Sequence, residues 1–339
     1  MKSALCVLAA AGFVSSAMGQ DVTMVFPAPS FDRWMYPFNS TPGVELQSPA
    51  FGAILQPGFD DRDSQFLMSF NTSAFAPAGQ GVEKYRILSG TLLLVIANDN
   101  EVFYDPTPDS VTSLYAQGDP QQTTDADPGR PIELFGAGYR NGWSLSTFLE
   151  SSRFGGTPIA QPAEGARNVF AATFDPQMNA TDISRQVRQR FEATPLAIGT
   201  TTSVQPGQRL PLASFIQFNL SPCDSQTRRY LQWSLNEGRL NLIASSLEPA
   251  SGGPGGGSGD RTYPIFYTRE NGGSLPARLI LQVRVGNPAD FTGDGFVDGF
   301  DYDGFVEAFE NGNDAADFNQ DCFIDGFDYD DFVAAFEQG

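Results

Sequence analysis

The sequence predicts a mainly β protein: an antiparallel β-sandwich or jelly roll with a few short helices, followed by a small α-helical module. Strand-like runs alternate with turn residues, in a chain with 24 Pro and 35 Gly. Helical periodicity is confined to short stretches, and the C-terminal segment repeats itself. We expect a signal peptide over residues 1–19, a β-sandwich domain over 20–286 and the small module over 288–339.

The N-terminus, MKSALCVLAAAGFVSSAMGQ, has the pattern of a bacterial Sec-type signal peptide. One Lys precedes a short apolar run, and small residues stand at Ala17 and Gly19, so we expect cleavage after Gly19. The run is too short to span a bilayer, and the alternative is a buried N-terminal strand. The sequence thus predicts a secreted or cell-surface protein.

Export gives two cysteines a possible role. Cys223 and Cys322 remain after cleavage, and an oxidising compartment permits a disulfide between them. Such a bridge would tie the small module to the larger domain. The alternative is two free thiols.

Five runs in the body have strand character. They are Tyr85–Val95, Asn168–Phe174, Arg209–Leu220, Arg239–Leu247 and Ala277–Val285. The last alternates most clearly. One face holds Leu279, Leu281, Val283 and Val285, and the other holds Arg278, Gln282 and Arg284.

Two stretches in the body have helical character. Thr181–Phe191 has apolar residues four apart and either Thr181 or Asp182 as N-cap, and Ser225–Gly238 has Ser225 as N-cap and Gly238 as C-terminal glycine. The Gly-rich stretch Ser251–Gly259 is interpreted as a flexible loop, because strand-like sequence resumes at Tyr263.

The C-terminal repeat carries a metal-binding pattern. DFTGDGFVDGFD starts at residue 290 and DFNQDCFIDGFD at residue 317. A 12-residue calcium loop supplies oxygen ligands from positions 1, 3, 5, 7 (a carbonyl), 9 and 12. These positions hold Asp290, Thr292, Asp294, Phe296, Asp298 and Asp301 in the first copy, and Asp317, Asn319, Asp321, Phe323, Asp325 and Asp328 in the second. The sequence therefore predicts two bound Ca²⁺ ions.

The two copies differ at position 6, where the chain turns sharply. The first has Gly295, which adopts positive φ without strain, and the second has Cys322, which does not. Position 12 is Asp in both copies, where the common EF-hand loop has Glu. Phe305 and Phe309, like their counterparts in the second copy, are four apart on a helix. The alternative is a disordered acidic tail.

Two calcium loops, each with an exiting helix only, resemble the dockerin type I module of secreted bacterial proteins over residues 288–338. The resemblance implies calcium binding and docking onto a cohesin-like module of a scaffold protein. In that family positions 10 and 11 help select the partner, and here they are Gly299, Phe300, Gly326 and Phe327. Their identity in both copies would allow docking in two orientations.

Charge and composition exclude several functions. Of the 40 acidic residues, 15 lie in residues 287–339, which contain no Lys or Arg, so the remaining chain is nearly balanced. No basic patch indicates nucleic acid as a partner. The absence of His excludes Ser-His-Asp, Cys-His and His-zinc catalysis. Carboxylate-pair chemistry such as glycoside hydrolysis remains open.

In the body, Asp60, Asp61 and Asp63 could form a glycosidase pair or a further calcium site. The favoured interpretation is a solvated loop in which Arg62 offsets the charge. Asp99, Asn100 and Glu101 indicate a hairpin turn. The aromatic residues that could stack on sugars are Trp34, Trp143, Trp233, Tyr36 and Tyr139. Trp233 is expected in the core, and Trp34 is the best surface candidate.

The order of strands and short helices in the body, with the closing segment FYTREN…ARLILQV, resembles DNRLRE-type, carbohydrate-binding-like β-sandwich modules. That resemblance implies structure or adhesion. The combined expectation is a secreted, calcium-binding, non-catalytic protein whose body is structural or binds polysaccharide. The alternatives are an extracellular polysaccharide-degrading enzyme that carries a dockerin, and a tail that is only a calcium-dependent stability clamp.

Overall fold

The computed structural model describes residues 20–155, 164–250, 262–271, 273 and 275–339. The expected signal peptide and the Gly-rich stretch 251–259 lie outside these residues. The described chain divides into two compact units. Val22–Val283 is called the body below, and Arg284–Gly339, with residues 20–21, is called the C-terminal unit.

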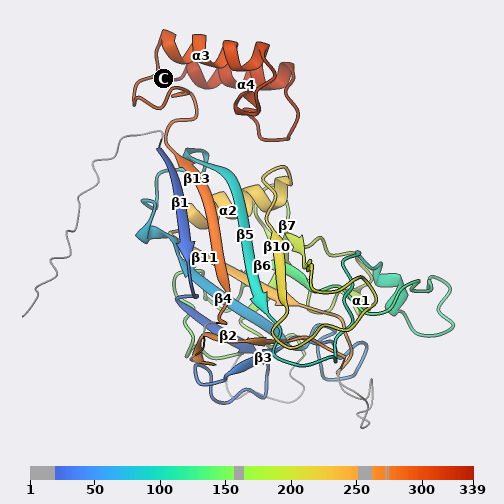
Figure 1. The fold of residues 1–339 in the computed structure, drawn as a ribbon. Coiled ribbons are helices and arrows are strands. Elements are labelled where there is room, and N and C mark those ends of the chain that lie inside the picture. The colour runs from blue at the N-terminus through green and yellow to red at the C-terminus, as the bar shows by residue number, and fades with distance from the viewer. Residues whose placement is uncertain (1–19, 156–163, 251–261, 272, 274) are drawn as a thin grey trace, which may run out of the picture. The chain divides into compact units, whose positions relative to one another are not determined.

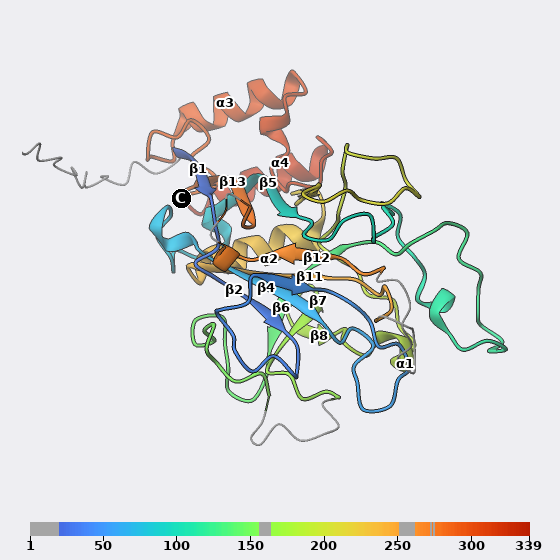
Figure 2. The same ribbon diagram turned by 60° about the horizontal axis from the view of Figure 1, so that its bottom comes forward.

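Two main sheets form the body (Figure 1). The first has the order β1 (Gln20–Phe26), β13 (Arg278–Val285), β5 (Tyr85–Val95) and β10 (Phe215–Asn219). The second has the order β2 (Phe31–Met35), β4 (Gln65–Asn71), β11 (Arg239–Ser245), β6 (Glu133–Tyr139), β7 (Val169–Phe174) and β8 (Ala180–Asp182), and β9 (Ala197–Ile198) also pairs with β6 (Figure 2). A short third sheet joins β12 (Ile265–Tyr267) to β3 (Gln47–Pro49).

The neighbouring strands of the second sheet pair antiparallel, as do β5 and β10. On β13, Leu279, Leu281 and Val283 are fully buried, as the alternating pattern predicts. Phe66 of the second sheet stacks on Phe266 of β12, with ring centroids 5.9 Å apart. The mainly β, antiparallel and sandwich-like architecture is thus confirmed.

The predicted strand over Arg209–Leu220 is too long, because only Phe215–Asn219 forms β10. The first half contains Pro211, which has no N–H for a ladder, and Ala213 at φ 64°. Ser214 N–H donates to the carbonyl of Pro211, which closes a turn before the strand begins.

The helix α2 (Ser225–Asn236) packs against β5 and β11, one strand from each main sheet. Its N-cap is Asp224, not Ser225: the Asp224 carboxylate accepts from Thr227 N–H at 2.7 Å. Gly238 follows the helix at φ 74°, which agrees with its predicted role.

The predicted helix over Thr181–Phe191 is reduced to α1 (Gln186–Gln189). Thr181 and Asp182 belong to β8 instead, where they pair with β7, because the sheet ladder satisfies their main chain. Arg190 at φ 58° ends the helix. The short 3₁₀ helices are Thr72–Ala74, Val82–Lys84, Val111–Leu114, Arg269–Asn271 and Asp314–Ala316.

The C-terminal unit contains α3 (Gly299–Glu310) and α4 (Gly326–Phe336), one after each acidic loop (Figure 1). Phe305 and Phe332 are fully buried and stack with centroids 4.0 Å apart. Phe309 and Phe336 pack against the same cluster, so the predicted four-residue spacing does place each pair on one helix face. None of the described helices has the length and hydropathy needed to cross a bilayer.

Candidate metal sites

The first acidic loop wraps its main chain around Asp290. One carboxylate oxygen of Asp290 accepts from the N–H groups of Gly293 at 2.9 Å and Asp294 at 3.0 Å, and the other accepts from Gly295 at 2.9 Å. Gly293 and Gly295 have φ values of 76° and 93°, which residues with a Cβ adopt only under strain. The expected positive φ at position 6 is confirmed.

The end of this loop is also the start of α3. Asp298 accepts from Phe300 N–H and Asp301 accepts from Asp298 N–H, each at 2.9 Å, which forms a capping box. The other oxygen of Asp301 accepts from the N–H and the hydroxyl of Thr292 at 2.8 and 2.9 Å. Asp301 is fully buried. The helix start therefore holds the carboxylate at position 12 against the opposite side of the loop.

The second loop repeats this arrangement with one strained turn. Asp317 accepts from Asp321 N–H at 3.1 Å and from Cys322 N–H at 3.0 Å, and Asp328 accepts from Asn319 N–H at 3.0 Å. Cys322 has φ 69° and Gln320 has φ 61°, where the first loop has glycines. The second loop is the more strained of the two, as the Cys at position 6 predicts.

The negative charges of these loops have no basic residue in the same segment of the sequence to balance them. Residues 287–339 contain no Lys or Arg, yet Asp290, Asp301 and Asp328 are buried. Carboxylate, amide and carbonyl oxygens on a 12-residue loop are the ligand set that suits Ca²⁺. The residues of both loops therefore fit a hard divalent cation.

The carboxylates of the loops are not drawn together to metal-ligand spacing. Among the described residues, two sets of three carboxylates have oxygen atoms within 4.8 Å of one another, and neither set lies in these loops. Main-chain N–H groups instead hold the loop carboxylates, as at Asp290 and Asp317.

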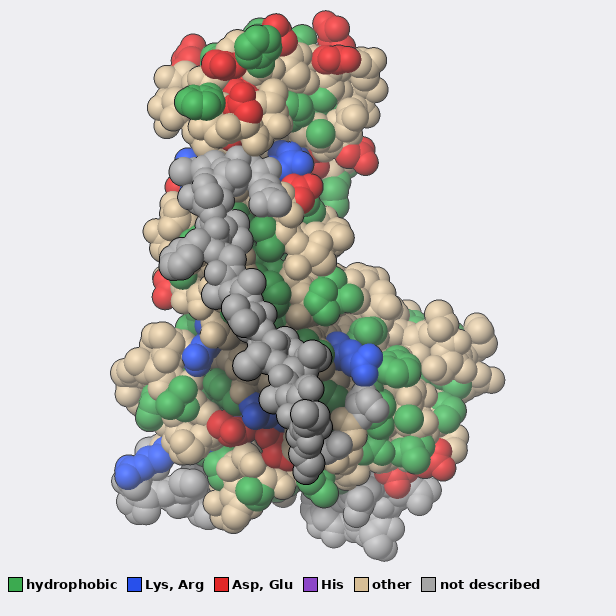
Figure 3. All heavy atoms as spheres, turned by 60° about the vertical axis from the view of Figure 1, so that its left-hand side comes forward, with side chains coloured by type: hydrophobic (Ala, Val, Ile, Leu, Met, Phe, Trp, Pro, Cys, Tyr) green, Lys and Arg blue, Asp and Glu red, His purple; other side chains and the backbone are tan. Residues whose placement is uncertain are grey.

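Four phenylalanines protrude from the loops in two equivalent pairs. Phe296 and Phe300 are 71% and 74% exposed, and Phe323 and Phe327 are 70% and 71% exposed. Acidic and hydrophobic side chains gather on the surface of this unit (Figure 3). Gly299 and Gly326 stand beside them, and a Cβ at either position would meet no atom within 4 Å.

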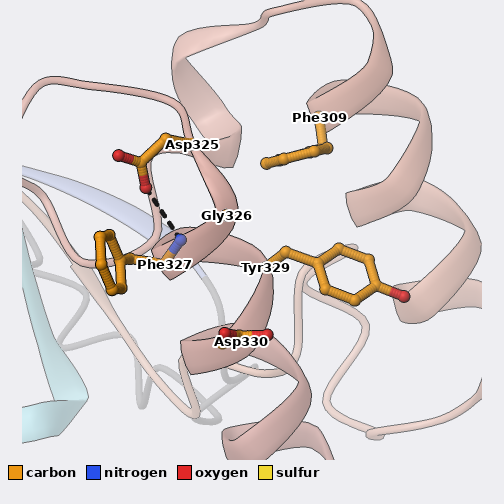
Figure 4. A pocket seen from close by; sticks show the side chains of 6 residues that line it. All are labelled: Phe309, Asp325, Gly326, Phe327, Tyr329 and Asp330. Atoms are coloured by element: carbon orange, nitrogen blue, oxygen red, sulfur yellow. Dashed lines mark hydrogen bonds between the residues drawn. The ribbon is translucent and has the colours of Figure 1, made fainter.

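A shallow pocket of about 460 Å³ adjoins the second pair (Figure 4). Its lining residues are Phe309, Asp325, Gly326, Phe327, Tyr329 and Asp330. Within it the Asp325 carboxylate accepts from Phe327 N–H at 2.8 Å, which holds the phenylalanine at the pocket edge. The predicted partner-selecting residues of the second loop thus line a concave surface.

The cysteines of the described residues, Cys223 and Cys322, are both disulfide-bonded. This state agrees with the prediction of a disulfide and with the oxidising surroundings of a secreted protein.

The prediction of a solvated loop at Asp60, Asp61 and Asp63 is wrong. All three are at most 2% exposed. Asp60 pairs with Arg167 at 2.9 Å and accepts from Gly165 N–H, while Asp61 pairs with Arg188 at 3.0 Å. The reason is tertiary, since these arginines come from segments more than 100 residues away.

Arg62 does not offset its neighbours either. Its guanidinium donates to Glu133 at 2.5 Å and to Gln186 at 2.9 Å, and it is 1% exposed. Burial raises the pKa of Asp63 to about 6, against the lowering effect of Arg167. The cluster is a buried ionic network, and its acids are engaged by arginines and main-chain groups.

The aromatic candidates divide between partly exposed and packed positions. Trp34 is half-buried, stacks on Tyr36 with centroids 4.7 Å apart and donates to Ser64 Oγ. Trp143 packs against the core, and the Tyr139 hydroxyl accepts from Asn241. Trp233 is half-buried beside Tyr230 rather than in the core. Asn100 adopts φ 54° in a bend that includes Asp99, so the chain does turn there. The turn is not a hairpin, because Ile96 and Val102 on its two sides pair with Ser214 and Leu210 and not with each other.

The two sets of closely spaced carboxylates were not found by sequence reasoning. They are Asp32 with Glu150 and Glu270, and Asp105 with Asp109 and Asp127. The first set has no local signal, because its members are more than 100 residues apart. The second has one in the alternating oxygen side chains of Asp105, Thr107 and Asp109.

Comparison of the chain with protein-family models and with curated proteins gives no match.

Proposed function

We propose that this is a secreted calcium-binding protein with a non-catalytic β-sandwich body and a dockerin-like C-terminal module for attachment to a surface or protein assembly. The observation that supports this most is the repetition of one loop geometry. In both copies the carboxylate at position 1 accepts main-chain N–H groups, and those at positions 9 and 12 form the capping box of the next helix.

Two Ca²⁺ ions would be held by Asp290, Thr292, Asp294, Phe296, Asp298 and Asp301, and by the equivalent residues of the second loop. The ions would offset eight carboxylates that no basic residue of residues 287–339 balances. The module should therefore depend on calcium for its structure.

The exposed phenylalanines are the expected attachment surface. Large apolar side chains that protrude in pairs are costly in water unless a partner covers them. A cohesin-like module that contacts Phe300 with Gly299, or Phe327 with Gly326, would find the same chemistry in either orientation, because the two loops present equivalent pairs.

A pull-down with the full chain tests the attachment. The bait is the mature protein with calcium or with chelator, and the prey is a set of purified cohesin domains. Calcium-dependent retention that Phe300→Ala with Phe327→Ala abolishes is the expected result. Phe75→Ala is the matched control, since Phe75 is an exposed phenylalanine of the body. Equal retention by the double variant contradicts the proposal.

For the body, the half-exposed Trp34 and Tyr36, with exposed Phe38 in edge contact with Tyr36, favour glycan binding over hydrolysis. The acids Asp60 and Asp61, which a hydrolase would need free, are each paired with an arginine. A glycan array and a reducing-sugar assay on the mature protein separate the two functions. Released sugar that Asp63→Asn abolishes would establish the alternative, a polysaccharide-degrading enzyme.

A further inference from the structure

Three carboxylates from distant parts of the body meet beside β2, an edge strand of the second sheet. Asp32 lies in β2, Glu150 lies in the segment after β6, and Glu270 lies in the 3₁₀ helix Arg269–Asn271. Their oxygen atoms lie within 4.8 Å of one another. Asp32 is 1% exposed, while Glu150 and Glu270 are partly exposed, so the group is open to solvent on one side.

Two oxygen atoms of this group are buried without a hydrogen-bond donor. Asp32 accepts from Arg269 N–H at 2.9 Å through Oδ2, but its Oδ1 has no partner. Oε1 of Glu150 also has none. A buried carboxylate oxygen that lacks a donor is unfavourable, so two of them side by side indicate a missing positive ligand.

The nearby arginines do not fill this role. Arg269 Nε lies 3.2 Å from Glu270, so it offsets one of the three charges. Arg33 donates instead to the main-chain carbonyls of Glu150 and Ser152, which fixes the segment that carries Glu150. Among the described residues, Asp32 and Glu150 have no ion-pair partner.

The other close set of carboxylates has one buried oxygen without a partner, Oδ2 of Asp105, where the group at β2 has two. Arg130 Nη1 lies 2.8 Å from Asp109, so each set has one acid paired with an arginine. The group at β2 is therefore distinguished by its two unpartnered oxygens.

We propose that Asp32, Glu150 and Glu270 bind one calcium ion, separate from the two C-terminal loops. Calcium takes oxygen ligands at about 2.4 Å, so two opposite ligands stand about 4.8 Å apart. The spacing of the three carboxylates falls within that limit. The partly exposed side leaves room for the waters that complete the coordination shell.

The surroundings suit such an ion. A Cβ at Gly43, whose φ is 87°, would come within 3.1 Å of the Glu150 carboxyl carbon, so glycine lets the main chain approach the acid.

The ion would join three segments that the fold brings together only here. It would link β2, the segment of Glu150 and the 3₁₀ helix that follows β12. Binding to the folded state alone would stabilise the body.

The test counts bound calcium in the full chain by isothermal titration calorimetry and native mass spectrometry. A loop-deficient variant carries Asp290→Asn, Asp301→Asn, Asp317→Asn and Asp328→Asn. It should still bind one calcium ion and gain thermal stability from it. Adding Asp32→Asn, or Glu150→Gln in its place if the first variant does not fold, should remove that ion. Asp109→Asn is the matched control and should leave the count unchanged.

A loop-deficient variant that has the native circular dichroism of the body and binds no calcium overturns the proposal. Magnesium titrated in place of calcium should give a weaker response, because Mg²⁺ requires shorter and more regular coordination. This test distinguishes the body site from the two C-terminal loops. If the wild-type protein binds a single ion and Asp32→Asn removes it, calcium binding by the loops is contradicted while the body site is supported.

Discussion

The two units of this protein bury aspartates in opposite ways. In the body, Asp60 and Asp61 are fully buried beside the guanidinium groups of Arg167 and Arg188. In the C-terminal unit, Asp301 and Asp328 are fully buried in a segment without a Lys or Arg, and only N–H and hydroxyl donors reach them.

The two units therefore differ in the source of the positive charge that compensates their buried aspartates. Burying a carboxylate is unfavourable unless hydrogen bonds and an opposite charge compensate it. The body carries the charges that compensate Asp60 and Asp61 in its own sequence, so this cluster should fold without metal. Residues 287–339 carry no such charge, so on the proposed function this segment should take a cation from solution.

Calcium removal should give the largest effect. With chelator, α3 and α4 should lose helicity while the body keeps its sheet signal, because eight loop carboxylates then repel one another. Far-ultraviolet circular dichroism with chelator, and again after calcium is restored, measures this. A spectrum that does not change would show that the loops fold without metal, and the two units would then not differ in their need for calcium.

In the body, Arg167→Met should cost about 3–5 kcal/mol in the free energy of unfolding, because it leaves Asp60 buried and unpaired. Arg190→Met is the matched control. Its pair with Asp119 is solvent-exposed and screened by water, so the cost should be far smaller than that of Arg167→Met. Urea unfolding with saturating calcium measures both, and equal losses would contradict the structural role of the buried pair.

Asp63 should make the body less stable as the pH rises from about 4 to about 6. Its pKa is about 6 in the folded state and near 4 in the unfolded chain, so the folded state holds the extra proton in that window. Stability from this group is complete below the window and falls by up to about 1.4 kcal/mol per pH unit within it. Asp63→Asn should reduce this pH dependence of the free energy of unfolding, measured by urea unfolding at several pH values. An unchanged pH dependence would mean that another group causes it.

The smallest effect concerns the strained turn of the second loop. Cys322→Gly and Cys322→Ser both remove the disulfide bond of Cys322, but only glycine relieves φ 69°. The glycine variant should bind calcium about fivefold more tightly at this loop, from about 1 kcal/mol of strain. Calorimetry on both variants measures the ratio, and equal affinities would mean that the turn relaxes without cost.

The loops could be predicted because all their ligand positions lie within 12 consecutive residues. The same holds for the period-2 pattern of β13 and for the glycine after α2. In each case the structure-determining contacts are local. The extent of α1 could not be predicted, because pairing of β8 with β7 competes with the helix.

The sequence alone determined the local chemistry of this protein: duplicated loops rich in carboxylates, alternating strands and the exclusion of histidine-based catalysis. Only the tertiary structure decided which carboxylates are paired. Asp60 meets Arg167 across 107 residues of chain, and Asp32, Glu150 and Glu270 meet beside one edge strand. Burial and charge compensation depend on neighbours in space, and a motif records only neighbours in sequence.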